Sequence, residues 1–559
     1  MDRPGGALIQ LQRDLRARRG VGLAGLLAAP VAFLLYFFAW PVANIVGRGL
    51  RGDHGWQLSG VGDVLGDPQM RHVIWFTAWQ AAASTALTLA VALPAAHVLA
   101  RYEFRGRRFV QAVATVPFVL PTVVVGAAFV ALLGPTGPLG IDLDGTVWAI
   151  LLAHAFFNHA VVVRVVGGMW EQLDPTTADA ARVLGASPAK VARAVTLPAL
   201  RPAIASAALI TFLFTFTSFG VVRILGGASH ATLEVEIYRQ TASLLNLPVA
   251  SILALVQLVA VGTLLVVQGR LARRWTRAGV VMRPAARRRA VGARQRAWVI
   301  GNLLAMAVLL VTPLAVLVER SFDTGDGHGL AAWRALGAHH ATTGLFVSPL
   351  AALANSFRFA AVATIVSVVL GGLAAAALVR ATGRVGRALD VGLLLPLGTS
   401  AVTVGFGFLI ALDRPFDLRA SPILVPLAQA VVAMPFVVRT MAPVLRSIDE
   451  RLREAAAVLG AAPARVWREV DLPLVLRAAL VSAGFAFAIS LGEFGATTVI
   501  ARADAPTMPV AIDRLLGRPG ALNVGQAFAL STVLMVCTAA SVLVVDRVRT
   551  DRRSPGGWW

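Results

Sequence analysis

The chain repeats itself in a single fixed register, in which residue 179 corresponds to residue 454. Residues 179–198 read DAARVLGASPAKVARAVTLP, residues 454–473 read EAAAVLGAAPARVWREVDLP, and thirteen of the twenty positions are identical. The match continues outward without a gap, since AHAFFNHAVVVR at 153–164 faces AQAVVAMPFVVR at 428–439. A duplicated and fused unit should fold twice in the same way. We therefore expect a first half over residues 1–269, an arginine-rich linker over 270–296 and a second half over 297–559.

Composition places this repeated fold in a membrane. The chain is 57% hydrophobic and 14% charged, and its mean hydropathy of +0.73 is too high for a soluble protein. Apolar runs of about 20 residues predict six spans in each half. They lie near 21–47, 74–100, 109–134, 146–166, 202–225 and 247–268, and near 297–318, 355–379, 388–412, 421–438, 475–500 and 522–545. The predicted fold is an all-α membrane protein of about twelve transmembrane helices.

The arginines predict how these spans are oriented. Residues 270–296 carry ten arginines and no acid, and further arginine clusters lie at 101–108, 380–387 and 547–553. All of them fall on one side if each half has six spans and the N-terminus is cytoplasmic, in agreement with the positive-inside rule. Both termini are then cytoplasmic, and the two halves share one orientation as a parallel repeat. Anionic lipid headgroups explain the linker more simply than nucleic acid does, so we expect membrane lipid and no nucleic acid as partners.

Each copy of the repeated segment predicts a short helical hairpin between the fourth and fifth spans. In the first copy, residues 174–184 have helical spacing, Gly185 ends the helix, and Ser187-Pro188 supplies a cap and a first-turn proline for a second helix. Leu197-Pro198 follows, where proline suits the start of the next transmembrane helix.

The second copy has the same plan with one capping residue changed. Residues 449–459 form the first helix, Gly460 the break, and Ala462-Pro463 the start of the second helix, before Leu472-Pro473. Because alanine has no hydroxyl to cap the helix, this copy should lose about 1 kcal/mol of helix stability.

This hairpin resembles the EAA loop, in which EAA-x3-G is followed by a terminal LP, of permease subunits in binding-protein-dependent ABC importers. The matching residues are Glu454, Ala455, Ala456, Gly460 and Pro473, and, with aspartate in place of glutamate, Asp179, Ala180, Ala181, Gly185 and Pro198. The resemblance implies a type I importer fold in a bacterial inner membrane. It implies that each loop docks on one of two separate ATP-binding cassette subunits, and that an extracytoplasmic substrate-binding protein delivers the cargo.

The chain itself has no sequence for binding ATP. A Walker A loop needs a lysine in G-x4-G-K-[ST], and the single lysine, Lys190, lies between Ala189 and Val191. We expect a transport subunit that is not an enzyme and has no cofactor of its own, with ATP bound by the partner subunits. No metal site is expected, because Cys537 lies alone in the last span and His339-His340 has no second ligand pair nearby.

Within the importer family, several segments resemble the fused two-half permeases for thiamine and ferric iron. They are AHAFFN at 153–158, SFGVVRILGG at 218–227, ATLEVEIYRQ at 231–240 and SLGEFGATTVI at 490–500. Together they are most similar to the thiamine permease, although SLGEFGAT is also similar to segments of molybdate and sulfate permeases. The resemblance favours thiamine as cargo, with ferric iron or an oxyanion as alternatives.

Two positions in equivalent places are candidates for the transport pathway. Glu493 falls inside the eleventh span, where an ionised carboxylate costs at least ~2.5 kcal/mol and faces a cavity or a partner. It either contacts cargo or bonds to nearby backbone. Its counterpart in the first half is Ser218.

Polar residues of the fourth span form a second candidate group. His154 and Asn158 are four residues apart and share a helix face, and His159 follows. They either contact cargo or hydrogen-bond neighbouring helices, and the second role is the commoner one. Glu234 and Glu236, in the loop after the fifth span, would meet the binding protein or cargo, or lie on a solvated face.

Two rival functions differ in what the hairpins do. In the importer, the loops around Gly185 and Gly460 convert closure of the ATPases into alternating access between the halves. An ion-driven secondary transporter with parallel halves would need no ATPase and would tolerate bulky residues at both glycines. A membrane-anchored regulator would instead use the segment 270–296 to bind nucleic acid, although that segment lacks interleaved aromatics apart from Trp275.

Overall fold

The computed structural model describes residues 24–52, 55–56, 59–276, 287–323, 327–338, 345–414 and 417–550. Within these ranges the chain is helical, and the only paired strands are the two-residue segments β1 (Arg51–Gly52) and β2 (Gly55–Trp56). The prediction of an all-α membrane fold is confirmed. His339, His340 and the middle of the arginine-rich linker lie outside the described residues.

Ten helices of the described chain are long and apolar enough to cross a membrane, and two bent helix pairs raise the number to twelve. The first-half spans are Ala24–Leu50, which contains η1 (Leu35–Ala39) and α2 (Trp40–Leu50), α4 (Pro68–Arg101), α8 (Val147–Gln172), Pro188–Phe216, and Leu247–Leu271 within α14 (Leu247–Thr276). The second-half spans are Ala293–Arg320, with α15 (Ala293–Leu310) and α16 (Thr312–Arg320), α18 (Pro349–Arg380), α21 (Leu424–Arg446), Ala464–Gly492, and Ala521–Val545 within α27 (Ala521–Thr550).

The two bent pairs correct the straight spans predicted at 109–134 and 388–412. In the first half, α5 (Arg107–Val113) and α6 (Val116–Val119) meet α7 (Thr122–Leu133) at 104°. In the second, α19 (Gly383–Leu394) and η5 (Leu395–Gly398) meet α20 (Ala401–Ala411) at 94°. The first bend lies at Leu120-Pro121, where both residues are extended, because proline has no N–H to continue the helix and disfavours helical backbone before it.

Two further predicted spans end early, and they do so at equivalent places. The helix expected over 202–225 ends with α11 (Leu197–Phe216) and is followed by α12 (Gly220–Leu225). The helix expected over 475–500 ends with α24 (Leu472–Gly492) and is followed by α25 (Gly495–Ile500). Outside the two hairpins, the other short helices of the described chain are α3 (Ser59–Gly66), α13 (Leu233–Tyr238), η3 (Arg239–Ser243), α17 (Ala331–Ala335) and α26 (Met508–Leu516).

The chain divides into two compact units that interleave in the sequence. One unit comprises residues 1–45, 354–505 and 540–559, and the other comprises 46–353 and 506–539. The first span therefore packs with helices of the second repeat, while the span from α15 to α16 packs with helices of the first. The boundaries proposed at 269 and 297 describe the duplication of the sequence, whereas these compact units divide the chain elsewhere.

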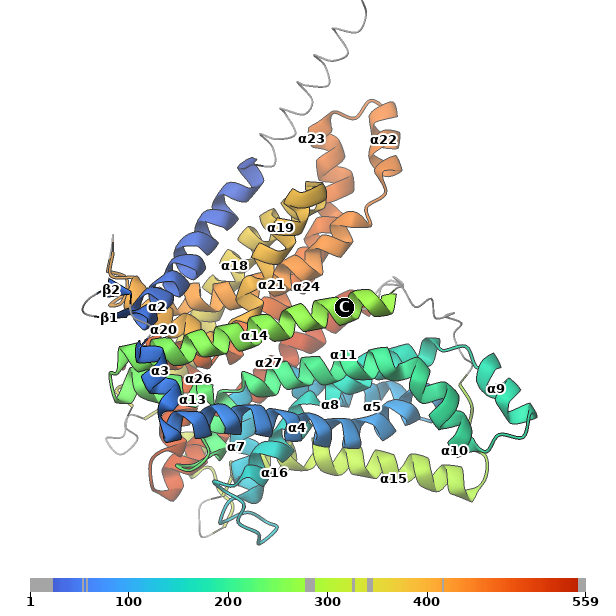
Figure 1. Cartoon of the computed structure of the whole chain (residues 1–559), viewed down its shortest axis with the longest axis horizontal. Coiled ribbons are helices and arrows are strands. Elements are labelled where there is room, and N and C mark those ends of the chain that lie inside the picture. Colours follow the sequence, from blue (N-terminus) through green and yellow to red (C-terminus); the bar gives the residue numbers. More distant parts are fainter. Residues whose placement is uncertain are drawn as a thin grey trace, which may run out of the picture. The chain divides into compact units, whose positions relative to one another are not determined.

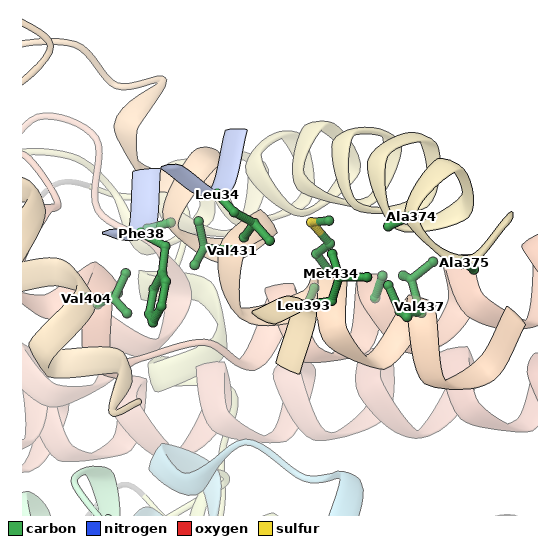
Figure 2. Packing of buried hydrophobic residues seen from close by; sticks show 14 of the residues in the cluster. Leu34, Phe38, Ala374, Ala375, Leu393, Val404, Val431, Met434 and Val437 are labelled. Carbon is green, nitrogen blue, oxygen red and sulfur yellow. The ribbon is translucent and has the colours of Figure 1, made fainter. Parts of the chain in front are cut away.

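The core of the unit that holds the second repeat includes the first span (Figure 2). Leu34 and Phe38 are buried with Val404, Val431 and Met434 in one hydrophobic cluster. The ring of Phe37 also lies 5.9 Å from that of Phe408. The first span thus covers an apolar face formed by α20 and α21.

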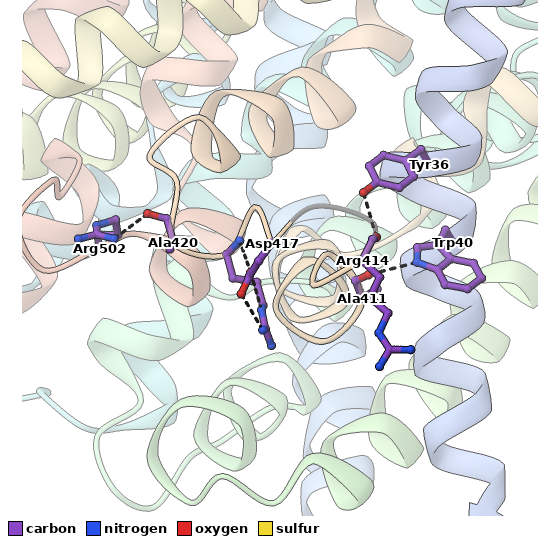
Figure 3. A network of polar contacts seen from close by, with 8 residues as sticks. Tyr36, Trp40, Ala411, Arg414, Asp417, Ala420 and Arg502 are labelled. Carbon is purple, nitrogen blue, oxygen red and sulfur yellow. Dashed lines mark hydrogen bonds and ion pairs between the residues drawn. The ribbon is translucent and has the colours of Figure 1, made fainter.

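Polar contacts fix the first span against the end of α20 (Figure 3). Tyr36 donates from its hydroxyl to the carbonyl of Arg414 at 3.2 Å, and the indole N–H of Trp40 donates to the carbonyl of Ala411 at 3.1 Å. The bond from Trp40 satisfies a carbonyl that the end of α20 leaves without an intrahelical partner, and the bond from Tyr36 reaches the turn just after it.

The other unit has a matching arrangement around α7 and α8. Met306 and Leu310 of α15 are buried in a cluster with Phe129, Ile150 and Phe156. Helix α4 packs along α8, and α11 packs against both (Figure 1). Each repeat therefore has the leading span of the other repeat packed on it.

Candidate coupling loops and transport pathway

The first hairpin joins α9 (Thr176–Val183) to α10 (Pro188–Val191) through a left-handed glycine. Gly185 has φ +82°, and its N–H donates to the carbonyl of Arg182 at 2.9 Å, while the N–H of Ala186 donates to the carbonyl of Ala181 at 3.0 Å. This pair of bonds is a Schellman motif, which satisfies the last carbonyls of a helix. Ser187 then caps α10 by accepting from the N–H of Lys190 at 3.3 Å.

The second hairpin has the same geometry between α22 (Glu450–Val458) and α23 (Pro463–Val466). Gly460 has φ +81°, its N–H donates to the carbonyl of Ala457 at 3.0 Å, and the N–H of Ala461 donates to the carbonyl of Ala456 at 3.0 Å. The third residue of each EAA segment therefore supplies the carbonyl that closes the turn. The predicted helix, glycine and helix are present in both copies.

Each hairpin exposes an apolar pair at its tip. Val183 and Leu184 are 87% and 86% exposed, and Val458 and Leu459, at the equivalent positions of the second repeat, are each 87% exposed. Unpartnered apolar surface of this kind marks an interaction site when it is grouped and rimmed by polar residues. The equivalent pairs in two hairpins indicate two equivalent docking surfaces.

The acidic residue that begins each EAA segment is exposed, but its surroundings differ. Asp179 forms an ion pair with Arg182 one turn later in α9. Glu454 has no ion-pair partner in the part of the chain that the structure describes. Ala180 and Ala455 are exposed beside them, one helical turn before the apolar tips.

The two hairpins differ at the residue before the EAA segment. Ala178 is buried under the first hairpin. In the second hairpin its counterpart, Arg453, donates to the carboxylate of Asp471 at 2.8 Å. A buried alanine and an ion pair thus occupy equivalent positions, so the two loops should respond differently to salt.

The second helix of each hairpin continues directly into the membrane. Helix is unbroken from Pro188 to Phe216 and from Ala464 to Gly492, so Pro198 and Pro473 lie within a continuous helix rather than at the start of a separate one. Each proline follows a π-helical segment, η2 (Ala192–Thr196) or η6 (Trp467–Asp471). The wider turn accommodates a residue without an N–H, and each helix of 29 residues is a lever about 43 Å long.

At the far end of the first lever, His154 joins three helical segments. Its Nδ1 lies 2.9 Å from the hydroxyl of Ser84 on α4, and its Nε2 lies 2.9 Å from the hydroxyl of Ser218, just after α11. His154 is 2% exposed and Ser218 is 7% exposed. Both ring nitrogens therefore make interhelical bonds in this structure.

Asn158 and His159 are also buried, with unsatisfied polar atoms. Asn158 donates to the carbonyl of His154 at 3.0 Å, while its Oδ1 and both ring nitrogens of His159 have no hydrogen-bond partner among the described residues. The equivalent of His154 in the second repeat is Gln429, which is also buried. Buried polar groups of this kind need water or another partner to offset the loss of solvation.

Glu493 caps the short helix that follows the second lever. Its carboxylate accepts from the N–H of Ala496 at 2.8 Å and from the N–H of Thr497 at 3.0 Å. The hydroxyl of Thr497 donates back to the carbonyl of Glu493 at 2.8 Å. The side chain, which is 7% exposed, thus bonds to nearby backbone at the start of α25.

Two glycines let the bent spans pack closely against these short helices. A Cβ at Gly126 would lie 2.8 Å from Ile224 of α12, and a Cβ at Gly405 would lie 2.8 Å from backbone atoms of Ala496 in α25. The same close approach occurs in both repeats, and in the second it holds the helix that Glu493 caps.

Glu234 and Glu236 do not lie on a solvated face. Both carboxylates are fully buried. Glu234 accepts from the amide of Gln257 on α14, and Glu236 accepts from the amide of Gln240 at 2.6 Å and pairs with Arg239 at 3.0 Å. Both side chains are thus buried and bonded to residues of the first repeat, so we do not assign them to the surface that meets a binding protein.

Comparison with known proteins agrees with the repeated hairpins. The family described as binding-protein-dependent transport system inner membrane component matches residues 73–277 and again residues 367–553. The chain is 25% identical over 524 residues to the probable ABC transporter permease protein y4fN of Sinorhizobium fredii, covering 88% of this chain and 90% of the relative.

Two further relatives carry names that state a cargo. The thiamine transport system permease protein ThiP of Brucella abortus is 28% identical over 506 residues, covering 87% of this chain and 89% of the relative. The molybdenum transport system permease protein ModB of Mycobacterium tuberculosis is 35% identical over 217 residues, covering 36% of this chain and 81% of the relative.

The family model and the two longer relatives match both repeats, and each repeat contains one hairpin with an exposed tip and one long lever helix. Such permeases are multi-pass proteins of the bacterial inner membrane that work with an ATPase and a substrate-binding protein. By its two matched domains, the chain belongs to the family of binding-protein-dependent transport system inner membrane components.

Proposed function

We propose that the chain is the membrane subunit of a thiamine importer and that it engages two ATPase subunits, one at each hairpin. The observation that carries the proposal is the pair of equivalent exposed tips, Val183-Leu184 and Val458-Leu459. Each tip is joined to a long lever helix by a short glycine turn. A push on either hairpin would therefore pass through one short glycine turn into a helix long enough to cross the membrane.

The coupling residues are those of the two EAA segments. Gly185 and Gly460 set the turn, Ala181 and Ala456 close it, and Asp179 and Glu454 offer exposed carboxylates to a partner. Pro198 and Pro473 follow the π-helical segments at the base of each lever.

ATP is bound by the partner subunits, and the chain has no cofactor of its own. The single lysine, Lys190, is not in a Walker A sequence, and its N–H instead completes the cap of α10.

The hairpins and both termini lie on the cytoplasmic side. An ion pair between Arg107 and Glu171 at 2.6 Å joins the arginine-rich turn after α4 to the end of α8, which leads into the first hairpin. The positive-inside rule places such arginines in the cytoplasm.

Thiamine is favoured as cargo because the match to a thiamine permease covers most of both chains. A second candidate, an oxyanion such as molybdate, is supported by the higher identity, over 217 residues, to a molybdenum permease. In either case, the residues that line the pathway or hold its helices in place are Glu493, Ser218, Asn158 and His154.

The test is uptake by the permease reconstituted with its ATPase and binding protein in proteoliposomes. Labelled thiamine, ferric iron and molybdate are offered separately, with and without ATP. We expect ATP-dependent uptake of thiamine alone. Uptake of molybdate or iron in place of thiamine would show that the cargo assignment is wrong. Uptake driven by an ion gradient without the ATPase would contradict the assignment as an ATP-driven importer.

A further inference from the structure

Polar side chains run along the interface at which α4, α8 and α11 pack together within one compact unit. Gln80 of α4 donates from its side-chain amide to the carbonyl of Thr215 on α11 at 2.9 Å. One turn further along α4, the hydroxyl of Ser84 lies 2.9 Å from Nδ1 of His154 on α8. These two contacts fix how the three helices are aligned, because they join all three at neighbouring turns.

This alignment places three unpartnered oxygens at neighbouring turns of the same interface. Thr211 lies one turn before Thr215 on α11, and Asn158 lies one turn after His154 on α8, so each shares a helix face with a contact residue. The Oε1 of Gln80, the Oγ1 of Thr211 and the Oδ1 of Asn158 have no hydrogen-bond partner among the described residues. All three side chains are buried. The interface therefore contains a run of unsatisfied acceptors.

The chemistry of these groups indicates what they would bind. The amide of Gln80 donates to two backbone carbonyls and that of Asn158 to one, so both amide oxygens are left pointing away from their protein contacts and can only accept. A ligand must therefore donate hydrogen bonds. Water donates and accepts, so it also suits the hydroxyl of Thr211 and the ring of His159, whose two nitrogens are likewise unpartnered in the described chain.

The second repeat shows that the fold does not require these polar groups. In the register that relates residue 179 to residue 454, the counterparts of Asn158, His159 and Thr211 are Ala433, Met434 and Ala486. All three counterparts are buried in the hydrophobic cluster of that repeat, and Figure 2 shows Met434 among its apolar side chains. The same arrangement of helices is thus built there from apolar residues.

The remaining positions of the second repeat agree with this difference. Gln429 and Ser490 are polar and buried, and each has one unpartnered oxygen. Counted back from the arginines that end α4 and α18, the positions of Gln80 and Ser84 are occupied by Phe359 and Ala363. The second repeat therefore has two separate polar positions where the first has a run along three helices.

We propose that the first repeat binds a row of buried water molecules between α4, α8 and α11, held by Gln80, Thr211, Asn158 and His159. Buried water is found where polar groups lack a protein partner, and each molecule makes about three hydrogen bonds. The site rests on these buried groups alone and does not depend on the identity of the cargo.

The bound waters would let the first lever move. Gln80 and His154 both bond to the end of this lever, at Thr215 and Ser218. Water can replace such bonds when the lever shifts, so they are exchanged and not lost. In the second lever, Ala478 and Ala486 lie in an apolar cluster. This role in lever movement rests on the proposed function, whereas the water site does not.

The first test is X-ray radiolysis of the whole permease in lipid nanodiscs, which generates hydroxyl radicals from water and oxidises the side chains beside it. His159 and Met434 occupy equivalent positions and are each 0% exposed, so bulk water contacts neither. Mass spectrometry should find label at His159 and none at Met434, although methionine is readily oxidised. His328, which is 68% exposed, is the positive control. Label at His328 with none at His159 would overturn the water site.

Rapid mixing with water enriched in the heavy oxygen isotope separates bound water from a transient opening of the helices. Bound water exchanges slowly with bulk, so the oxygen added at His159 should still be the light isotope when that added at His328 is already heavy. Equal isotope content at both histidines would mean that bulk water enters, and a bound row would be wrong.

A double variant tests whether the named groups hold the water. Asn158→Ala with Thr211→Ala removes two acceptors without removing a hydrogen bond between helices, because Asn158 donates within α8 and the hydroxyl of Thr211 has no partner in the described chain. Label at His159 should fall by about 5-fold or more. The matched control is Thr241→Ala, a buried threonine outside this interface that bonds within its own helix. Unchanged label in the double variant would contradict the assignment of these groups.

Uptake in proteoliposomes tests the role of the waters in lever movement. In the double variant, ATP-dependent thiamine uptake should slow by about 3-fold or more, since lost bonds are no longer replaced by water. Lost label with unchanged uptake would overturn that role. If the parent takes up no thiamine, the proposed function fails, and the labelling, which needs neither cargo nor ATPase, still decides the water site.

Discussion

At the scale of single residues, the two hairpin glycines have the most restricted backbone in the proposed coupling loops. Gly185 and Gly460 have φ of +82° and +81°, and a Cβ at either position would meet no atom within 4 Å. There is therefore room for a side chain at both positions, but the left-handed backbone conformation disfavours any residue with a Cβ. The glycines are required by the Schellman turn itself and not by contact with another helix.

Replacing both glycines by alanine should cost about 1 kcal/mol per hairpin, because an L-residue is strained in the left-handed region. Asparagine should cost less, since it tolerates this conformation. Amide hydrogen exchange of the hairpins should speed up in the alanine variant, with a smaller change for asparagine. Equal exchange in the alanine variant and the parent would contradict the turn as the reason for these glycines.

The sequence is compatible with two roles for Glu493, contact with cargo and bonding to nearby backbone. Its hydrogen bonds suggest variants that distinguish the two roles. Glu493→Ala removes both bonds to backbone N–H groups and should lower stability by about 1 to 2 kcal/mol. Glu493→Gln keeps one acceptor and should lower it less. Thermal unfolding in detergent measures both.

The same variants test contact with cargo. If capping is the role of Glu493, the KM for transport should be unchanged in Glu493→Gln. A large rise in KM without a loss of stability would assign the carboxylate to cargo instead.

At the scale of elements, a hairpin and the lever behind it form one mechanical piece. The π-helical segments occur at the same place in both repeats, between the docking tip and the membrane. They adjust the helix around Pro198 and Pro473 without interrupting it. Movement of a tip should therefore be passed to the helices that end beside Ser218 and Glu493.

Charged residues at the tips should uncouple the permease from its ATPase. Val183→Asp with Leu184→Asp should weaken ATPase binding at one site, and the equivalent change at Val458 and Leu459 at the other. With all four changed, co-purification of the ATPase should be lost by about 10-fold or more, because each change puts a charge into an apolar contact.

A control for general surface charge is Val291→Asp, since Val291 is 76% exposed but outside both hairpins. It should leave ATPase binding unchanged. Binding that survives all four tip changes would mean that the ATPase docks elsewhere.

At the scale of the whole molecule, the two repeats exchange their leading spans. Residues 24–45 pack in the unit of the second repeat, through the apolar cluster of Leu34 and Phe38 and the polar bonds of Tyr36 and Trp40. Each repeat thus depends on the other for part of its core. The duplicated halves should not fold well as separate chains.

A disulfide should trap the first span against the second repeat. A Cβ at Gly407 would lie 2.8 Å from the Cβ of Pro41, about 1 Å closer than is typical of disulfides, so the two helices must separate by that amount for the bond to form. In a Cys537→Ser background, Pro41→Cys with Gly407→Cys should cross-link on mild oxidation. After cleavage of the chain within the linker, the two fragments should stay joined until reduction.

The matched control is Pro41→Cys with Leu409→Cys, because residues two apart on a helix face different directions. This pair should not cross-link. Equal cross-linking of both pairs would mean that the first span is not held in the described position.

Local patterns in the sequence carried most of the fold and of the coupling loops. Short stretches of chain determine the register of the repeat, the apolar runs and the hairpins around Gly185 and Gly460. These features can therefore be predicted without a structure. Hydropathy could not separate a straight span from one bent at Leu120-Pro121, because both bury the same apolar residues. It also could not reveal the burial of Glu234 and Glu236, since their amide partners determine it.

By itself, then, the sequence determined a duplicated helical membrane fold with one coupling hairpin in each repeat, because periodicity, glycine and proline act over a few residues. Only the tertiary structure decided which span packs on which repeat, how Glu493 caps a helix, and that His154 meets Ser84 and Ser218. These contacts join residues tens to hundreds of positions apart, or depend on a chain break that hydropathy does not mark. Their partners are chosen by packing in three dimensions and not by local pattern.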